Sequence, residues 1–281
     1  MEPKSTDTYR GNLDKLLAKV LEERGLDLHQ FRRPYVERRV AARLRSLGLH
    51  TYRQYVAFID AHPGEYEQLL DTLTINVTDF FRDPGLYDVL RNRVFPQVIA
   101  AKSAQRHRVI RLWSAGCATG EEPYSVMMAF LDLLGPRIDD FTVSMTATDI
   151  DPVALAVAES ATYEMSDIGR IPRRDRMRYI DVADGTFTFL PVVTRHVKFR
   201  RLNLFDDEPV RMVDMLFCRN VFIYFGRSQQ EQILERFWSA LSRGGYLILG
   251  RSEKLAPSLA GRLELVDSRE RIYRKPTGKP L

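Results

Sequence analysis

The apolar residues of the first 75 positions recur at the spacing of amphipathic helices. The first predicted helix has apolar positions at i, i+3, i+4, i+7 and i+8, which are Leu13, Leu16, Leu17, Val20 and Leu21. The second begins at Pro34, which suits a first helical position, and ends before Gly48. Its apolar stripe consists of Val36, Val40, Leu44 and Leu47. With two more helices predicted over about 51–59 and 65–73, residues 1–75 should form a small all-α domain.

From about Arg108 the pattern changes to short apolar runs that alternate with helical patterns, which is typical of a parallel sheet with crossover helices. The predicted strands are 109–113, 141–148, 197–201, 213–218 and 246–249, and the predicted helices are 123–134, 152–160 and 228–242. The weakly alternating segment 263–274 is expected to form a closing antiparallel hairpin. The turn pair at Asp184 and Gly185, followed by strand formers, predicts a small β-hairpin subdomain over about 182–199. The fold class is therefore α/β over 93–281, joined to the helical domain by a linker over 76–92.

Composition places the chain among soluble globular proteins. Of its 281 residues, 44% are apolar and 28% charged, which excludes collagen-like, disordered and disulfide-stapled classes. The sequence predicts no signal peptide, and no run approaches the roughly 18 apolar residues of a membrane span. Cys117 and Cys218 are too few for a disulfide framework or a zinc site. We therefore expect a cytoplasmic protein with free thiols, without membrane insertion and without a metal.

The excess positive charge is concentrated in one short stretch. The chain has 42 basic and 37 acidic residues, a net charge of +5. Between positions 29 and 53, seven arginines face one glutamate, which gives +6 and leaves −1 for the rest of the chain. On the second predicted helix, Arg38 and Arg45 point away from the apolar stripe, while Arg39 and Arg43 flank it. An acidic partner is expected to bind there.

A glycine-containing loop at 113–123 lies between a predicted strand and a predicted helix. Such a loop lets a ligand approach the backbone near the positive end of a helix dipole. A dinucleotide site normally has three glycines, whereas this loop offers only Gly116 and Gly120. Glu121 and Glu122 would repel a pyrophosphate, so a cofactor with an ammonium or sulfonium group fits better. A tight turn that binds no ligand is the alternative.

An acidic residue follows the next predicted strand, where ribose hydroxyls are conventionally bound. Asp149 is the candidate for that role. Asp151 precedes Pro152 and is better interpreted as the cap of the following helix. The loop and the acidic strand end together predict a nucleoside cofactor, and the two glutamates favour S-adenosylmethionine over NAD.

Three other segments are candidates for chemistry or for structure. The polar and aromatic segment 76–82 could instead be a capped helix start with core phenylalanines. In segment 217–225 a buried strand runs into Arg219 and Asn220, at the edge where open parallel sheets bind ligands. Without further knowledge, Tyr224 would be a half-buried aromatic with its hydroxyl in water. Segment 244–253, a strand with glycines at both ends, is interpreted as structural.

Five segments together resemble the CheR family of chemotaxis receptor methyltransferases. They are Asn-Val-Thr-Asp-Phe-Phe-Arg at 76–82, Gly-Cys-Ala-Thr-Gly-Glu-Glu-Pro-Tyr-Ser at 116–125, Ala-Thr-Asp-Ile-Asp at 147–151, Cys-Arg-Asn-Val-Phe-Ile-Tyr-Phe at 218–225 and Gly-Arg-Ser-Glu at 250–253. The resemblance spans nearly the whole chain in the family's order. It implies a Rossmann-like methyltransferase domain with an inserted β-subdomain, preceded by an all-α domain. It also implies methyl transfer from S-adenosylmethionine to glutamate side chains of a chemoreceptor's cytoplasmic helices, giving glutamyl methyl esters and S-adenosylhomocysteine.

The resemblance assigns roles to individual positions. Its cofactor positions are Asn76, Thr78, Arg82, Glu122, Asp149, Asn203, Leu204, Arg219 and Asn220, to which the glycine loop adds Gly116. Arg82 and Tyr224 would lie nearest the transferred methyl, and Glu122 would pair with the methionyl ammonium. A glutamate with a pKa of about 4.3 is already ionised at neutral pH and needs no general base, so Arg82 is expected only to orient it. The acidic receptor helices would be recognised by Arg38, Arg39, Arg43 and Arg45.

The predicted hairpin corresponds to the family's β-subdomain, which in some members docks a receptor's carboxy-terminal pentapeptide. Because it is short here, we expect direct receptor binding without a pentapeptide tether, and a monomer. Three alternatives compete with this interpretation. The first is a nucleic-acid methyltransferase that uses the basic stretch for phosphates, although the polar string after the fourth strand differs from that of amino-directed DNA methyltransferases. The others are a catalytically silent cofactor sensor and an NAD-dependent oxidoreductase.

Overall fold

The computed structural model describes residues 6–24, 27–73 and 77–278. Contacts between Cα atoms divide the chain into two compact units. The first unit comprises Met1–Ile75 together with Tyr224–Gln229, and the second comprises Asn76–Ile223 and Gln230–Leu281. None of the described helices is long and apolar enough to cross a membrane.

The first unit is helical, because its apolar stripes can be buried only by packing helices together. Its elements are α1 (Thr6–Arg24), η1 (Leu28–Gln30), α2 (Arg33–Ser46), α3 (Tyr52–Ala61) and α4 (Glu65–Leu73). Three residues of the predicted α2 stripe, Val36, Val40 and Leu44, are buried, whereas the fourth, Leu47, is the half-buried C-cap. A capping box between Thr51 and Gln54 starts α3.

The segment Tyr224–Gln229 belongs to this helical unit although it follows a strand of the second unit. The Arg32 amide donates to the Tyr224 carbonyl at 2.9 Å, and Phe31 forms an isolated β-bridge with Phe225. The Phe31 and Phe225 rings lie 5.2 Å apart, and the Tyr35 and Tyr224 rings 5.1 Å apart. The first unit is therefore built from two separate stretches of chain.

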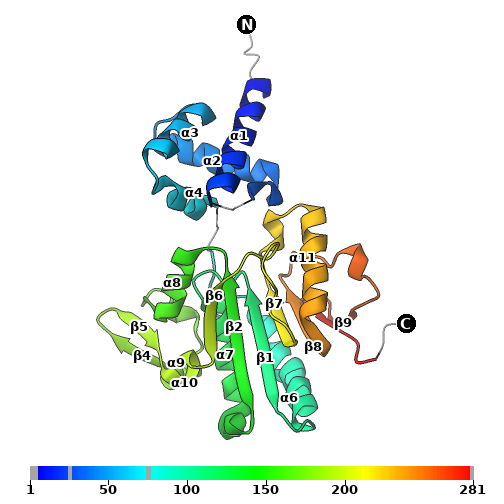
Figure 1. The fold of residues 1–281 in the computed structure, drawn as a ribbon. Helices are drawn as coiled ribbons and strands as arrows, with labels where there is room; N and C mark the ends of the chain where they lie inside the picture. Colours follow the sequence, from blue (N-terminus) through cyan, green and yellow to red (C-terminus); the bar gives the residue numbers. More distant parts are fainter. Residues whose placement is uncertain (1–5, 25–26, 74–76, 279–281) are drawn as a thin grey trace. The chain divides into compact units, whose positions relative to one another are not determined.

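The second unit contains a seven-stranded sheet in the order β6-β2-β1-β7-β8-β10-β9 (Figure 1). Its strands are β1 (Val109–Ala115), β2 (Thr142–Asp149), β6 (Val197–Arg201), β7 (Val213–Cys218), β8 (Leu241–Leu249), β9 (Glu264–Asp267) and β10 (Ile272–Arg274). The first five strands of this order pair in parallel, while β10 is antiparallel to β8 and β9. The strand order reverses between β1 and β7, and this switch point is where doubly wound sheets bind ligands.

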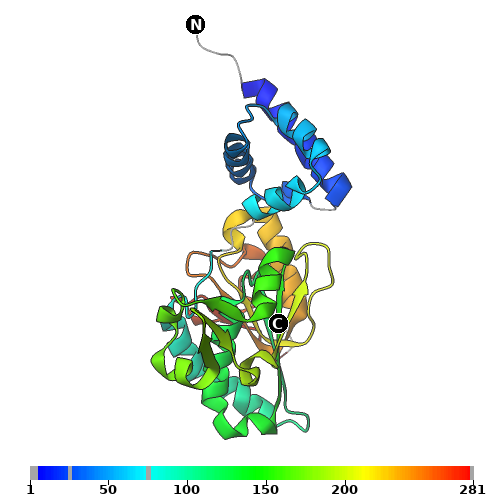
Figure 2. The ribbon, with the colours of Figure 1, turned by 90° about the vertical axis from the view of Figure 1, so that its left-hand side faces the viewer.

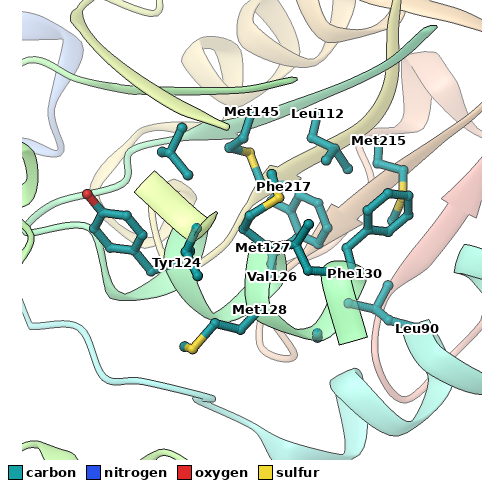
Figure 3. Close-up of a cluster of buried hydrophobic side chains, with 14 of the residues drawn as sticks. Leu90, Leu112, Tyr124, Val126, Met127, Met128, Phe130, Met145, Met215 and Phe217 are labelled. Atoms are coloured by element: carbon teal, nitrogen blue, oxygen red, sulfur yellow. The ribbon is translucent and has the colours of Figure 1, made fainter. Parts of the chain in front are cut away.

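Helices cover both faces of this sheet (Figure 1 and Figure 2). The helical elements that begin between residues 84 and 257, apart from those of the small β-subdomain, are α5 (Pro84–Val89), η2 (Leu90–Val94), α6 (Phe95–Ser103), α7 (Glu121–Leu134), η3 (Gly135–Asp140), α8 (Pro152–Ser160), η5 (Phe222–Tyr224), α11 (Arg227–Ala240) and η6 (Pro257–Leu259). Figure 3 shows Leu112 in one core cluster with Met127 and Phe130 of α7. The next residue, Trp113, points to the opposite face and packs edge-on against Phe237 of α11. The site is thus carried on a sheet buried on both sides.

The small β-subdomain is larger than the predicted hairpin, and the range 182–199 is wrong at both ends. It is a three-stranded antiparallel sheet in the order β3-β5-β4, formed by β3 (Thr162–Glu164), β5 (Thr186–Phe189) and β4 (Ile180–Ala183). The connecting elements are η4 (Ile168–Arg170), α9 (Arg173–Tyr179) and α10 (Pro191–Thr194), and residues 197–199 already belong to β6 of the large sheet. The predicted turn itself is confirmed, because Asp184 and Gly185 both have positive φ between β4 and β5. Figure 1 shows this sheet beyond β6.

The range 76–92, predicted as a linker, contains helix. Pro84 occupies the first turn of α5, and the chain continues through one turn of π-helix at η2 into α6. The helical spacing of the buried Leu86, Leu90 and Val94 explains why the segment packs into the second unit instead of spanning solvent.

Candidate active site

The polar residues singled out in the sequence follow four neighbouring strands at the same edge of the large sheet. Strands β6, β2, β1 and β7 are parallel neighbours, so their carboxyl ends lie side by side. Gly116 follows β1, Asp149 ends β2, and Arg219 follows β7. After β6, the Leu202 amide donates to the Asp149 carbonyl at 2.9 Å, which brings the next residues to the same place. The topology thus gathers residues that are far apart in the sequence.

The glycine loop is folded against the end of β2. The amides of Gly116 and Cys117 donate to the Thr148 carbonyl at 2.8 and 3.0 Å. Gly116 has a φ of 78°, and a Cβ there would lie 2.5 Å from Val221. Gly120 has a φ of 95°, and its Cβ would lie 2.9 Å from the Tyr163 hydroxyl. Contacts within the chain therefore explain both glycines, which differs from the expectation that they make room for a ligand.

The two aspartates after β2 have different surroundings. Asp151 accepts the amides of Val153 and Ala154 at 2.8 and 3.2 Å, which confirms its interpretation as the cap of α8. Asp149 accepts the Ala118 amide at 2.8 Å through one oxygen and the Asp151 amide at 3.1 Å through the other. Burial raises the pKa of Asp149, although these amides oppose the shift. Asp149 is thus a fixed acceptor that links the glycine loop to β2.

The two glutamates at the start of α7 are held by different partners. Glu122 accepts the Ser114 hydroxyl at 2.8 Å, and its other oxygen lies 3.2 Å from the Arg219 guanidinium. Glu121 accepts the Thr119 hydroxyl at 2.8 Å. Burial raises the pKa of Glu121 to about 7. Carboxylates at a helix N-terminus interact favourably with its dipole and repel anionic ligands, so this position suits a cationic group.

Arg82 is presented by a strained turn. Its neighbours Phe81 and Asp83 both have left-handed backbone, with φ of 50° and 60°. The Phe81 amide donates to the Ser125 hydroxyl at 2.9 Å, and Arg219 donates to the Arg82 carbonyl at 3.1 Å. The Arg82 guanidinium donates to the Val77 carbonyl at 3.0 Å.

Arg219 is a buried hub between the glycine loop and this turn. Besides Glu122 and the Arg82 carbonyl, its guanidinium contacts Asp83 at 2.5 Å. Burial works against its charge, but Glu122 and Asp83 outweigh this effect and raise the pKa of Arg219. The guanidinium is therefore engaged by the protein itself, and we interpret Arg219 as a residue that holds Glu122 and the Arg82 turn.

Asn220 is fixed in a left-handed conformation with φ of 61°. The buried carboxylate of Glu253 holds it by accepting the amides of Asn220, Phe222 and Gly250 at 3.1, 2.8 and 2.7 Å. Glu253, the last residue of the segment 244–253 interpreted as structural, thus holds backbone amides of the turn after β7 and of its own segment. The buried Oδ1 of Asn220 has no hydrogen-bond partner in the described part of the chain. It is an acceptor that a ligand could satisfy.

The remaining predicted positions differ in what the structure says of them. Asn203 donates to Asp206 at 2.7 Å and accepts the Phe205 amide at 3.0 Å, so its side chain orders its own loop, and Leu204 is half-buried beside it. Thr78 is half-buried ahead of the Arg82 turn. Asn76 lies outside the described residues. Tyr224 belongs to the first unit, where its ring packs on Tyr35.

The basic helix α2 does not leave all four predicted arginines for a partner. Arg38 and Arg45 are exposed, and Arg39 is half-buried. Arg43 instead forms a bidentate ion pair with the buried Glu65, with both contacts at 2.7 Å. We therefore propose a structural role for Arg43 and keep the recognition proposal for Arg38, Arg39 and Arg45.

The match to a known family agrees with this arrangement. Residues 11–74 match "CheR methyltransferase, all-alpha domain", and residues 76–272 match "CheR methyltransferase, SAM binding domain". The chain belongs to the CheR methyltransferase family. It is similar to chemotaxis protein methyltransferase Cher2 of Pseudomonas putida, with 34% identity over 254 residues that cover 87% of this chain and 91% of the relative. The chemotaxis protein methyltransferase of Borreliella burgdorferi is 30% identical over 251 residues, covering 88% and 89%.

A CheR methyltransferase uses S-adenosylmethionine as its methyl donor, and the chain is such an enzyme acting in chemotaxis. The residues at the strand edge fit this cofactor. Its ammonium and sulfonium are cationic and suit the carboxylates at the start of α7. Asp149 and the unsatisfied Oδ1 of Asn220 offer acceptors for hydroxyl and amino groups. Among the described residues, no group of three or more His, Cys, Asp or Glu could hold a metal ion.

Sequence reasoning missed several residues of this CheR site. Ser114 and Ser125 hold Glu122 and Phe81, and Asp83 joins Arg219. One signal was available for Ser114, which is a polar residue at the end of an apolar strand. The sequence offered no such signal for Asp83, because its partner Arg219 is 136 residues away.

Proposed function

We propose that the protein transfers a methyl group from S-adenosylmethionine to glutamate side chains of a chemoreceptor's cytoplasmic helices, in the cytoplasm, forming glutamyl methyl esters. The observation that supports this most is the Arg82 turn, which the buried Arg219 joins to Glu122. It combines a guanidinium suited to a carboxylate substrate with a carboxylate suited to a cationic cofactor. When bound, the cofactor supplies an electrophilic methyl group.

Arg82 holds and orients the glutamate nucleophile. One of its terminal nitrogens is engaged by Val77, and the guanidinium has further N–H donors. A tight bidentate pair would stabilise the ground state of the carboxylate and lower its nucleophilicity, so we propose that Arg82 acts through one or few hydrogen bonds. Positioning of this kind can contribute roughly 7 to 11 kcal/mol. The glutamate is already ionised at neutral pH and needs no general base.

The cofactor roles are proposals of the same kind. Glu122 pairs with the methionyl ammonium, Asp149 binds the ribose hydroxyls, and Asn220 accepts through its unsatisfied oxygen. Gly116, Thr78, Asn203, Leu204 and Asn76 are proposed cofactor contacts on the family resemblance alone, and Asn76 lies outside the described residues. Tyr224 remains a prediction of the family resemblance.

Receptor binding is assigned to the helical unit. Arg38, Arg39 and Arg45 of α2 face acidic methylation helices, and such rim charges accelerate encounter more than they tighten binding. We retain the prediction that the protein acts as a monomer and binds its receptor without a pentapeptide tether, although the three-stranded sheet is larger than the hairpin on which the second prediction rested. Nucleic acid is not expected to bind.

Radiolabelled methyl transfer to a receptor cytoplasmic fragment tests the proposal. Mild base should release volatile methanol from the product, because glutamyl methyl esters are base-labile. No such release from any cognate receptor would refute it. Arg82→Met should lower turnover more than it weakens binding of S-adenosylhomocysteine, whereas Arg137→Met, on the exposed η3, should alter neither. If Arg82→Met lowered turnover and the affinity for S-adenosylhomocysteine by the same factor, Arg82 would be reassigned to cofactor binding alone.

A further inference from the structure

The turn that carries Arg82 is held from two sides by charged groups. On the inner side, the buried Arg219 contacts Asp83 and the Arg82 carbonyl. On the outer side, Arg251 contacts the other Asp83 oxygen at 3.3 Å. Asp83 is thus shared between two guanidiniums. Because Asp83 has left-handed backbone, outside contacts are needed to keep the turn in this shape.

Arg251 is itself fixed by a second carboxylate. It forms a bidentate pair with Glu270, with contacts of 2.9 and 2.6 Å. Glu270 is only 4% exposed. A carboxylate this buried needs its partner, so the pair differs from ordinary surface ion pairs, which contribute little.

These contacts form one chain of alternating charge through the second unit. It runs from Glu270 to Arg251, Asp83, Arg219 and finally Glu122. We call these five residues the charge ladder. Its inner end, Glu122, is a proposed cofactor ligand, and its middle carries the backbone of the proposed substrate-orienting residue.

The outer end of the ladder is anchored to the backbone at several points. Glu270 lies in the turn between β9 and β10, and its amide donates to Asp267 at 2.8 Å. The next residue, Arg271, donates to the Arg251 carbonyl at 3.3 Å. Gly85 leaves room for the pair, because a Cβ there would lie 2.9 Å from the Glu270 carboxylate. The chain is thus locally shaped to bring Arg251 and Glu270 against the Arg82 turn.

We propose that Arg251 and Glu270 are positioning residues, which fix the Arg82 turn through Asp83 so that the guanidinium meets the substrate carboxylate in line with the transferred methyl. This inference rests on the proposed function, since it concerns the orientation of a glutamate nucleophile. It assigns a role in turnover to the β9–β10 turn, which contributes no residue to the cofactor edge. A small displacement of a positioned group can reduce the rate by up to about a hundredfold.

Methyl transfer to the receptor fragment by the full chain tests the role of the pair. The variants are Glu270→Gln, Arg251→Met and the milder Arg251→Lys, measured for kcat, for KM of both substrates and for binding of S-adenosylhomocysteine. We expect kcat to fall about tenfold or more in Glu270→Gln and Arg251→Met. The affinity for S-adenosylhomocysteine should stay within about twofold of wild type. Glu235→Gln is the matched control, because it removes a part-buried ion pair with Arg262 in the same unit that has no contact with the charge ladder among the described residues, and it should leave kcat unchanged.

A double-mutant cycle separates positioning from simple loss of stability. If Arg251 acts through Asp83, Arg251→Met should lower kcat by a much smaller factor in an Asp83→Asn background than in the wild type. The proposal would be overturned if the losses of kcat in the two single variants multiplied in the double variant. It would also be overturned if kcat stayed within twofold of wild type in both Glu270→Gln and Arg251→Lys. These two variants decide the question if Arg251→Met does not fold. A wild-type protein that methylates no glutamate would instead refute the proposed function.

Discussion

Arg43 and Glu65 form a bidentate ion pair inside the helical unit, and the Tyr55 hydroxyl donates to the same carboxylate at 2.7 Å. Burial alone would raise the pKa of Glu65, but the hydrogen bonds from Arg43 and Tyr55 outweigh it and lower the pKa. One of the arginines of the basic stretch therefore holds a buried carboxylate, while its neighbours Arg38 and Arg45 are exposed.

Removal of Arg43 should destabilise the helical unit. Arg43→Met leaves a carboxylate buried without its ion partner, at a cost of about 3 kcal/mol. Hydrogen exchange of peptides from α3 and α4 should accelerate accordingly. The stabilisation is present above a pH of about 4.5 and lost as pH falls, because the folded-state pKa of Glu65 is lowered. Arg38→Met is the control, and equal acceleration in that variant would contradict the assignment.

Charge reversal on the exposed face of α2 should slow receptor encounter without destabilising the fold. Arg38→Glu with Arg45→Glu should lower kcat/KM for the receptor about tenfold at low salt, since steering depends on the summed field. The difference from wild type should shrink as added salt screens the charges. Steady-state kinetics over a salt series measure this effect. A loss of the same size in Arg137→Glu, or one independent of salt, would argue against recognition by α2.

Glu121 should make stability depend on pH. Its pKa is raised by burial from 4.5 to about 7, so the folded state binds more protons than the unfolded state between these values. Stability from this group is therefore complete below a pH of about 4.5 and is lost as pH rises through about 7. In thermal unfolding across this range, the melting temperature of Glu121→Gln should increase relative to that of the wild type as pH rises. A constant difference between the two proteins would mean that Glu121 titrates normally.

The small sheet should affect cofactor binding through Tyr163. Its hydroxyl donates to the Thr119 carbonyl of the glycine loop at 2.7 Å. Tyr163→Phe removes about 1 kcal/mol of hydrogen bonding and should weaken binding of S-adenosylhomocysteine roughly fivefold by calorimetry. Tyr246→Phe makes the same chemical change at a hydrogen bond to Gln97, away from the loop. If both variants bind equally well, the small sheet does not support the loop.

Local signals in the sequence predicted much of the large sheet. The predicted ranges 197–201, 213–218 and 152–160 coincide with β6, β7 and α8, because strands of parallel sheets are nearly continuous apolar runs and Asp151 with Pro152 marks a helix start. The place of Asp149 at the end of β2 was predicted for the same reason. Residues that are close together in the sequence are sufficient to predict these features.

Features that depend on distant pairing could not be predicted. Strand β3 has only three residues and exists because β5, more than twenty residues later, pairs with it. The contact of Arg219 with Glu122 joins positions 97 residues apart, and the sequence shows two charges without showing that they meet. The same is true of Arg43 and Glu65, which are 22 residues apart and pair only in the folded helical unit.

Because Tyr224–Gln229 belongs to the helical unit, the helical unit of this chain cannot be exchanged for that of a relative by replacing one continuous stretch. The polypeptide passes between the two units after residues 75, 223 and 229, so a single junction cannot separate them. A chain that begins at residue 76 would expose Phe225, a residue only 6% exposed here, because Phe31 is missing. Recombination between relatives would have to replace both stretches together. A substitution that repacks the helical unit can therefore require a matching change in the sequence that follows β7.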